Sequence, residues 1–261
     1  MSNSHNHKYP FSKNKTLIKD SGEIHCYVGQ PSCNVFYKWI LENLEEQLHA
    51  GFGPPHPPLT KISSGQMGNL GESMAFLVGR FDRFSSPHFL AVLGGALTPF
   101  NSGTVIGVDI MIVYLDPNGN VENDRLFIQE MKTTCASDLN YSKELIDDYE
   151  KLLDTTKPSL SLMSRVSSLK AKLNWEHNYP NDLIQRVEDL AQPCVESCTR
   201  IRLLPTLIHD RNSDPVQALT HVLTEIQQQG WSQECIEAWS ISLTRLEQCL
   251  LHMANRLPFS P

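Results

Sequence analysis

Two stretches with the residue alternation of β-strands, joined by a short turn sequence, constrain the fold of this chain more than any other feature. The first stretch runs from Val105 to Leu115 and the second from Arg125 to Thr134. Between them lies the sequence Asp-Pro-Asn-Gly-Asn at positions 116–120. Proline presets φ, and Asn-Gly accepts the positive φ values that a reversal of the chain requires. The pattern therefore predicts an antiparallel hairpin whose loop is somewhat longer than the minimum.

Periodicity and turn residues predict the remaining elements. The first twenty residues are polar, and we expect them to be mobile. Apolar residues at helical spacing predict helices at 35–48, around 70–78, at 145–153, 162–173, 183–190, 215–229 and about 232–256, and a single strand-like run lies at 200–209. Two glycines and four prolines in positions 51–58 exclude a helix there and predict a linker or a rigid loop.

Length and composition place the chain among soluble globular proteins. Of its 261 residues 22 are Lys or Arg and 29 are Asp or Glu, which gives a formal net charge of −7. This balance excludes a broadly cationic surface, so a nucleic-acid role would need a local basic groove. The apolar stretches are shorter than the roughly 18 to 20 residues that span a bilayer, and the first thirty residues lack the apolar region of a secretory signal. Seven scattered cysteines without C-x-x-C spacing indicate reduced thiols, so we expect a cytoplasmic protein without membrane contact.

Charged residues interrupt the apolar hairpin at three positions. Asp109 lies in the middle of the first strand, and Glu130 and Lys132 share one face of the second strand. If Leu115 pairs near Asp124, the hairpin register places Asp109 opposite Glu130. Two carboxylates and one ammonium group then converge within several ångströms. The sequence therefore predicts a small charged pocket on a rigid backbone.

Two adjacent buried carboxylates are unfavourable unless a positive charge shares their site. Mg²⁺ suits such a site, because it takes one or two protein carboxylates and leaves positions for water and for substrate phosphate. Phosphate ester hydrolysis is the chemistry that this arrangement favours, and Lys132 would orient the attacking water or offset developing charge. The alternative is a solvated outer face of an edge hairpin, on which Glu and Lys pair for about a few tenths of a kcal/mol.

An acid on one strand followed by Glu-x-Lys on the next resembles the PD-(D/E)xK superfamily of restriction-like nucleases. The matching sequences are Gly107-Val108-Asp109 and Gln129-Glu130-Met131-Lys132, with Val108 in place of the family's proline. The resemblance covers roughly residues 65 to 172. It implies a Mg²⁺-dependent nuclease in which Asp109, Glu130 and the backbone carbonyl of Met131 bind the metal, while Lys132 serves the attacking water.

This family commonly carries a further acid on a helix ahead of the hairpin. Glu72, in Gly71-Glu72-Ser73, is similar to that acid and would support the metal shell. The alternative for Glu72 is an acid near the N-terminus of a helix, where it complements the helix macrodipole.

The size of the chain and its helical remainder are similar to the nuclease subunits of Hachiman-type anti-phage defence systems, in which a small nuclease partners a helicase. That resemblance implies an effector subunit that cleaves nucleic acid, DNA in preference to RNA, in a complex with a helicase or ATPase. Arg165, Lys170 and Lys172 on one predicted helix are candidates for contacts with the nucleic-acid backbone. Scattered surface charge is the alternative for these three residues.

The last predicted helix offers a different function. Ile236, Trp239, Leu243, Leu246 and Leu250 recur at spacings of three and four residues, which is typical of a seam for a partner helix and also of a core stripe. The alternative to the nuclease is therefore a non-catalytic adaptor that binds a partner through this helix.

These elements predict an α/β fold in which a mixed sheet with a central hairpin is flanked by helices, as in a restriction-endonuclease-like core, followed by a helical C-terminal part. We expect an N-terminal tail, helix and linker at residues 1–60 and a nuclease-like core at 61–210. A helical segment at 211–261 would pack on the core or on a partner.

Overall fold

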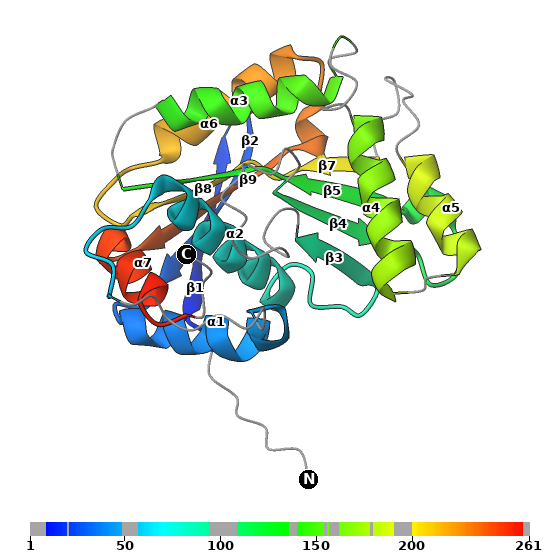
Figure 1. Ribbon diagram of the computed structural model, residues 1–261. Coiled ribbons are helices and arrows are strands. Elements are labelled where there is room, and N and C mark those ends of the chain that lie inside the picture. The colour runs from blue at the N-terminus through cyan, green and yellow to red at the C-terminus, as the bar shows by residue number, and fades with distance from the viewer. Residues whose placement is uncertain are drawn as a thin grey trace.

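The computed structural model describes residues 9–19, 21–48, 57–93, 109–135, 140–153, 156, 162–177, 180–190 and 200–257 (Figure 1). In this part of the chain, helices cover the faces of two β-sheets, which is a mixed α/β fold. None of the helices described is both long enough and apolar enough to cross a membrane.

The larger sheet has five strands and draws them from the whole length of the chain. In spatial order they are β1 (Phe11–Lys19), β2 (Gly22–Gly29), β9 (Glu237–Leu243), β8 (Thr206–Asp210) and β6 (Met131–Thr134). Strands β1 and β2 form an antiparallel pair, and β2, β9, β8 and β6 run parallel to one another. The boundaries expected at residues 60 and 210 therefore fall between strands of one sheet.

The smaller sheet has four strands and contains the predicted hairpin. Its order is β3 (Phe89–Leu93), β4 (Ile110–Tyr114), β5 (Arg125–Gln129) and β7 (Ile201–Leu203), with β7 parallel to β5 and the other pairs antiparallel. The antiparallel hairpin is confirmed for β4 and β5. The end of the predicted second strand, Met131–Thr134, is instead the separate strand β6, which pairs with β8, and residues 105–108 of the predicted first strand lie outside the described residues. The Gly119 N–H donates to the Asp116 carbonyl at 3.0 Å, and Gly119 has a φ of 78°, which favours glycine. A 3₁₀ turn at Val121–Asn123 lengthens the loop.

Two bent strands connect the sheets. Strands β5 and β6 are separated by Glu130 alone, and β7 and β8 are separated by Leu204 and Pro205. The pairing continues across both bends, because the Leu204 N–H donates to the Ile128 carbonyl and the Thr206 N–H donates to the Glu130 carbonyl. The two sheets are therefore branches of one forked sheet, and Glu130 lies at the fork.

Helices fill both sides of this forked sheet. On one face of the five-stranded sheet lie α1 (Cys33–Leu48), α2 (Ser64–Phe81) and α7 (Leu246–Ala254), which share one hydrophobic core. A second core lies under α3 (Asn140–Leu153) and α6 (Val216–Gln228), and it continues under α4 (Leu162–His177) and α5 (Asn181–Leu190) on the four-stranded sheet (Figure 1). Helix α2 approaches β6 closely at Gly71, where a Cβ would lie 2.0 Å from the Thr133 hydroxyl.

Six of the predicted helices are confirmed: α1 to α5 extend beyond their predicted ranges, and α6 lies within its range. The apolar stripes at 145–153, 162–173 and 183–190 belong to α3, α4 and α5, and the helix expected after Pro215 is α6. The predicted strand at 200–209 exists as β7 and β8, divided where Pro205 lacks an N–H. Most of the predicted linker at 51–58 lies outside the described residues.

Two other predictions of secondary structure are wrong. The polar N-terminal residues 11–19 are not mobile tail but strand β1, whose solvated face at a sheet edge needs no apolar alternation. The predicted helix at 232–256 contains β9, a central strand of the five-stranded sheet, and only Leu246–Ala254 is helical.

The C-terminal seam does not exist as a docking surface. Its members Trp239, Leu243, Leu246 and Leu250 have no exposed area, and Ile236 is 4% exposed. Strand β9 is covered on both faces and helix α7 packs on α1 and β9, so these side chains belong to the hydrophobic core. An adaptor that binds through this seam loses its structural basis.

Candidate active site

The hairpin register brings Asp109 and Glu130 together at the fork. Ile110 pairs with Gln129 and Tyr114 pairs with Arg125, so Asp109 and Glu130 occupy the next opposed positions. The Asp109 Oδ2 atom accepts a hydrogen bond from the Met131 N–H at 2.7 Å. The juxtaposition expected from the turn sequence is therefore observed.

The backbone of Met131 also faces Asp109. The Glu130 carbonyl is used by β8, whereas the Met131 N–H points away from β8, toward Asp109. In an extended strand the N–H and C=O of one residue point to the same side, so the Met131 carbonyl faces the side of β6 on which Asp109 lies. This is the carbonyl that the resemblance assigns to the metal.

Lys132 is fixed by carboxylates of α3. Its Nζ lies 2.7 Å from Asp148 Oδ2 and 3.9 Å from Glu144 Oε2. Burial acts to lower the pKa of Lys132, but the hydrogen bond to Asp148 and the charges of Asp148, Asp109 and Glu130 outweigh it and raise the pKa. Lys132 is therefore an ammonium group at neutral pH and acts by its charge and its N–H donors, not as a base.

Glu72 reaches the same cluster from α2. The helix begins at Ser64, after an N-cap at Ser63, so Glu72 lies two turns into it and is not a residue that complements the macrodipole at the N-terminus. Its Oε2 atom is buried without a hydrogen-bond partner among the described atoms. Burial and the neighbouring charge of Asp109 raise the pKa of Glu72 to about 8, although Lys132 opposes this shift.

Arg165 is placed differently from the sequence prediction. It does not lie on an exposed helix face, because it is 8% exposed and its Nη1 atom forms an ion pair with Oε1 of Glu130, which is 2% exposed. A residue buried in this way does not follow a nucleic-acid backbone at the surface. Lys170, on the same helix, pairs with Glu188 of α5 at 2.5 Å, and the side chain of Lys172 lies outside the described part of the chain.

Carboxylates outnumber their cations in this cluster. Burial raises the pKa of Asp109 to about 6, while the Met131 N–H and the charges of Lys132 and Arg165 oppose the shift. Burial also raises the pKa of Glu130, and Asp109 adds to this effect. Each of these shifts records a carboxylate that is short of water and of positive charge.

A divalent cation would supply the missing positive charge, and the side chains present are ligands that such a cation prefers. Asp109, Glu130 and Glu72 offer hard oxygen ligands. Among the described atoms, the Oε2 atom of Glu72 has no hydrogen-bond partner, so it is available to a metal ion. In the arrangement seen, Glu130 is engaged by Arg165, and the described residues contain no group of three or more His, Cys, Asp or Glu side chains placed to hold a metal. A metal at this site would therefore compete with Arg165 for Glu130.

Sequence reasoning missed three residues of the cluster. Asp148 anchors Lys132, and Arg165 pairs with Glu130. Tyr149, which has no exposed area, accepts a hydrogen bond from the Glu130 N–H at 3.1 Å and donates one to the Ile128 carbonyl at 3.3 Å. For two of them the sequence offered a signal, since Asp148 and Tyr149 lie beside the apolar residues of α3 that face the core.

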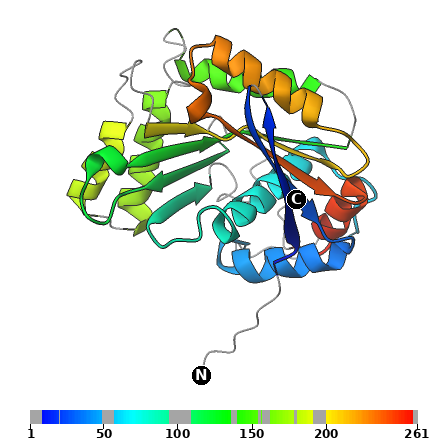
Figure 2. The same cartoon turned by 180° about the vertical axis from the view of Figure 1, so that it is seen from behind.

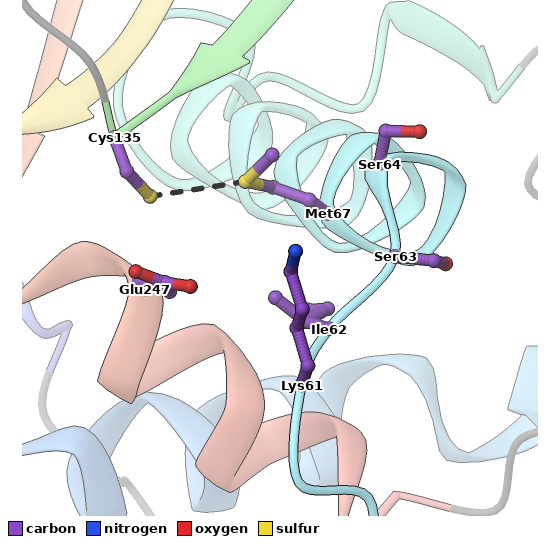
Figure 3. A pocket seen from close by; sticks show the side chains of 7 residues that line it. All are labelled: Lys61, Ile62, Ser63, Ser64, Met67, Cys135 and Glu247. Carbon is purple, nitrogen blue, oxygen red and sulfur yellow. Dashed lines mark hydrogen bonds between the residues drawn. The ribbon is translucent and has the colours of Figure 1, made fainter.

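A separate cavity of about 610 Å³ lies at the opposite end of β6 from this cluster (Figure 3). It is lined by Lys61, Ile62, Ser63, Ser64, Met67, Cys135 and Glu247. The Cys135 Sγ atom lies 3.8 Å from Met67 Sδ, and the side chains come from the start of α2, the end of β6 and α7. None of the predicted site residues lines the cavity, so it is distinct from the charged cluster.

A comparison of the sequence with protein-family models and with curated proteins finds no match.

Proposed function

We propose that the protein is a Mg²⁺-dependent nuclease whose active site is the cluster of Glu72, Asp109, Glu130 and Lys132. One observation carries the proposal: residues from α2, from the start of β4 and from the fork between β5 and β6 meet around carboxylates that lack sufficient positive charge. Structural ion pairs normally balance their charges, whereas a site for a divalent cation keeps an excess of carboxylates.

The residues divide the chemistry between them. Asp109 and Glu130, with the Met131 carbonyl, would hold the metal, and Glu72 would complete the acidic wall. When bound, Mg²⁺ supplies Lewis-acid activation of water and neutralises charge on the phosphate. Lys132, held by Asp148, donates N–H groups toward an attacking water or a phosphate oxygen. Hydrolysis adds water across one P–O ester bond and leaves a phosphate on one product and a hydroxyl on the other.

The proposal includes a restriction-endonuclease-like core for the hairpin, the fork and the flanking helices. The resemblance to Hachiman-type nucleases extends it to an anti-phage effector in the cytoplasm that cleaves DNA together with a helicase or ATPase. The net charge of −7 supports a partner, because it gives the isolated chain little non-specific attraction to nucleic acid.

Cleavage of plasmid DNA tests the proposal. Purified protein, alone or with a candidate helicase partner, is incubated with Mg²⁺ or with EDTA. We expect cleavage only with Mg²⁺, and its loss in Glu130→Gln and Lys132→Ala. Glu225→Gln on α6, at a partly exposed residue, and Lys143→Ala on α3, at an exposed one, change the same charges outside the cluster and should cleave as the wild type does. Equal cleavage by Lys132→Ala, Glu130→Gln and the wild type would end the nuclease proposal.

A further inference from the structure

The face of the four-stranded sheet that lies opposite α4 and α5 carries an unusual row of side chains. Phe89 of β3 pairs with Tyr114 of β4, and Tyr114 pairs with Arg125 of β5. Paired residues point to the same face of a sheet, so these three side chains form one row across three strands. Figure 1 shows α4 and α5 in front of this sheet, and Figure 2, from behind, shows its strands directly.

All three members of the row are only partly buried. The inner part of the same face is closed, because Phe84 packs on Phe127 with ring centroids 4.9 Å apart, and Phe127 is 6% exposed. Phe89 and Tyr114 lie at the border of this packed cluster, with their ring centroids 5.0 Å apart. Two partly exposed aromatic rings are thus held side by side on rigid strands.

Two further guanidinium groups gather beside Arg125. Arg202 of β7 is paired with Phe127, which places it on the same face, and Arg200 lies at the end of the same strand. Arg125 donates to the carbonyls of Glu122 and Asp124 at 2.6 and 2.8 Å, and Arg200 donates to the Val121 carbonyl at 3.4 Å. Burial lowers the pKa of Arg125, and the charges of Arg202 and Arg200 lower it further.

Asp124, the acid next to Arg125 in the chain, is engaged by another arginine. Asp124 is 1% exposed and is paired with Arg186 of α5 on the other face of the sheet, at 2.9 Å between Nε and Oδ2. Carbonyl oxygens, which accept most of the hydrogen bonds described for Arg125 and Arg200, carry no net charge. The face therefore combines two partly exposed aromatic rings with three arginines, in a chain whose net charge is −7.

We infer that this face, the row of Phe89, Tyr114 and Arg125 with Arg202 and Arg200 beside it, binds single-stranded nucleic acid. Unpaired bases stack on aromatic side chains of a sheet, and arginines beside them hold the phosphates. A duplex has no free base faces and would gain only the phosphate contacts. The inference goes beyond the proposed function, since binding here needs neither the metal nor cleavage.

The position of the row relates it to the acidic cluster. Arg125 begins β5 and Glu130 follows its last residue, so the two are five residues apart, or about 17 Å at roughly 3.3 Å per residue. Side chains 125 and 130 point to opposite faces of the sheet, so a nucleic-acid strand held on the row would have to pass from one face to the other to reach the cluster. The face is thus a holding surface for substrate and not part of the reacting site.

Fluorescence anisotropy with a labelled 20-nucleotide oligo(dT), in EDTA, tests this inference without any contribution from cleavage. We expect Phe89→Leu and Tyr114→Leu each to weaken binding by about fivefold or more, since one stacked base contributes about that much. Arg125→Gln should weaken binding and lower the slope of log affinity against log salt by about 0.7, which is the loss of one phosphate contact. Arg211→Gln, the same change on an exposed residue outside this face, should bind as the wild type does.

Three results would overturn the inference. They are no binding of oligo(dT) by the wild type, wild-type affinity in Arg125→Gln together with Tyr114→Leu, or equal affinity for a duplex of the same length with no effect of the leucine variants. Circular dichroism melting verifies that each variant is folded. Arg125 is partly exposed, so Arg125→Gln still tests the inference if a leucine variant does not fold. A variant that binds oligo(dT) normally but does not cleave would bear on the proposed nuclease site at the acidic cluster, and not on this inference.

Discussion

The two ends of strand β5 each carry a buried pair of an arginine and a carboxylate, and the two pairs are built differently. At the start of β5, Asp124 pairs with Arg186 through both carboxylate oxygens and also accepts the Asp116 N–H at 2.8 Å. At the other end, the Oε1 atom of Glu130 pairs with Arg165, beside Asp109 and near enough to Asp148 for the charge of that carboxylate to act on Glu130. The first pair is balanced in charge and in hydrogen bonds, whereas the second lies in an excess of negative charge.

This difference separates structure from function. A carboxylate whose acceptors are all used stabilises the fold and has nothing left for a ligand. A cluster with a surplus of carboxylates lowers the stability of the fold. Such clusters occur mainly at functional sites, where catalysis or ligand binding requires them. We therefore expect substitutions at the two ends of β5 to have opposite consequences for activity and for stability.

The largest effect should be on cleavage. Lys132→Ala should reduce the rate of plasmid cleavage by about 100-fold or more, because one positioned electrostatic donor contributes about that much to a reaction rate. Asp124→Asn, at the other end of the strand, should retain the rate per folded molecule to within a few fold. Single-turnover assays with protein in excess measure both rates. A comparable loss in the two variants would mean that the two ends do not differ in function.

The next effect should be on folding. Arg186→Ala leaves Asp124 buried without its partner and should lower the free energy of unfolding by about 3 kcal/mol. Glu130→Gln removes one of the crowded carboxylates and should change that free energy by about 1 kcal/mol at most, or raise it. Urea unfolding followed by circular dichroism compares them. The comparison fails if Glu130→Gln is the more destabilising substitution.

The smallest effect should be on the pH dependence of stability. Hydrogen bonds from the Asn123 side chain and the Asn118 N–H, at 2.7 Å each, lower the pKa of Asp116 below its usual value. Because the folded pKa is lowered, this stabilisation is present above the unfolded value near pH ~3.9 and is lost as the pH falls through the folded pKa. Asp116→Asn should therefore flatten the fall in unfolding free energy between about pH 5 and pH 2. A wild-type profile in the variant would contradict this assignment.

The sequence was informative where its signals were local. The turn at 116–120 and the alternation on either side of it fixed the register that brings Asp109 opposite Glu130, and amphipathic stripes located the helices. Strand β9 was misread because a parallel strand buried on both faces loses its alternation, and the spacing of Trp239, Leu243, Leu246 and Leu250 imitates a helix. Strand β3 was not predicted for a similar reason, since Phe89–Leu93 is an uninterrupted apolar run.

Partners distant in sequence could not be predicted. Glu130 and Arg165 are 35 residues apart, and nothing local in either segment indicates the contact. The same holds for Lys132 and Asp148, and for the gathering of Arg125 and Arg202, which depends on the parallel pairing of β5 and β7. Burial of a charged residue is a property of the tertiary fold, so the composition of a helix does not disclose it.

Binding of a divalent ion tests the central claim most directly. Mn²⁺ prefers oxygen ligands as Mg²⁺ does, and the fall of the free Mn²⁺ signal in electron paramagnetic resonance counts the bound ion. We predict that the wild type binds Mn²⁺, that Mg²⁺ displaces it, and that Asp109→Asn and Glu72→Gln weaken its binding while Glu225→Gln leaves it unchanged. Equal Mn²⁺ binding by the wild type and by Asp109→Asn, or none by the wild type, would contradict the account.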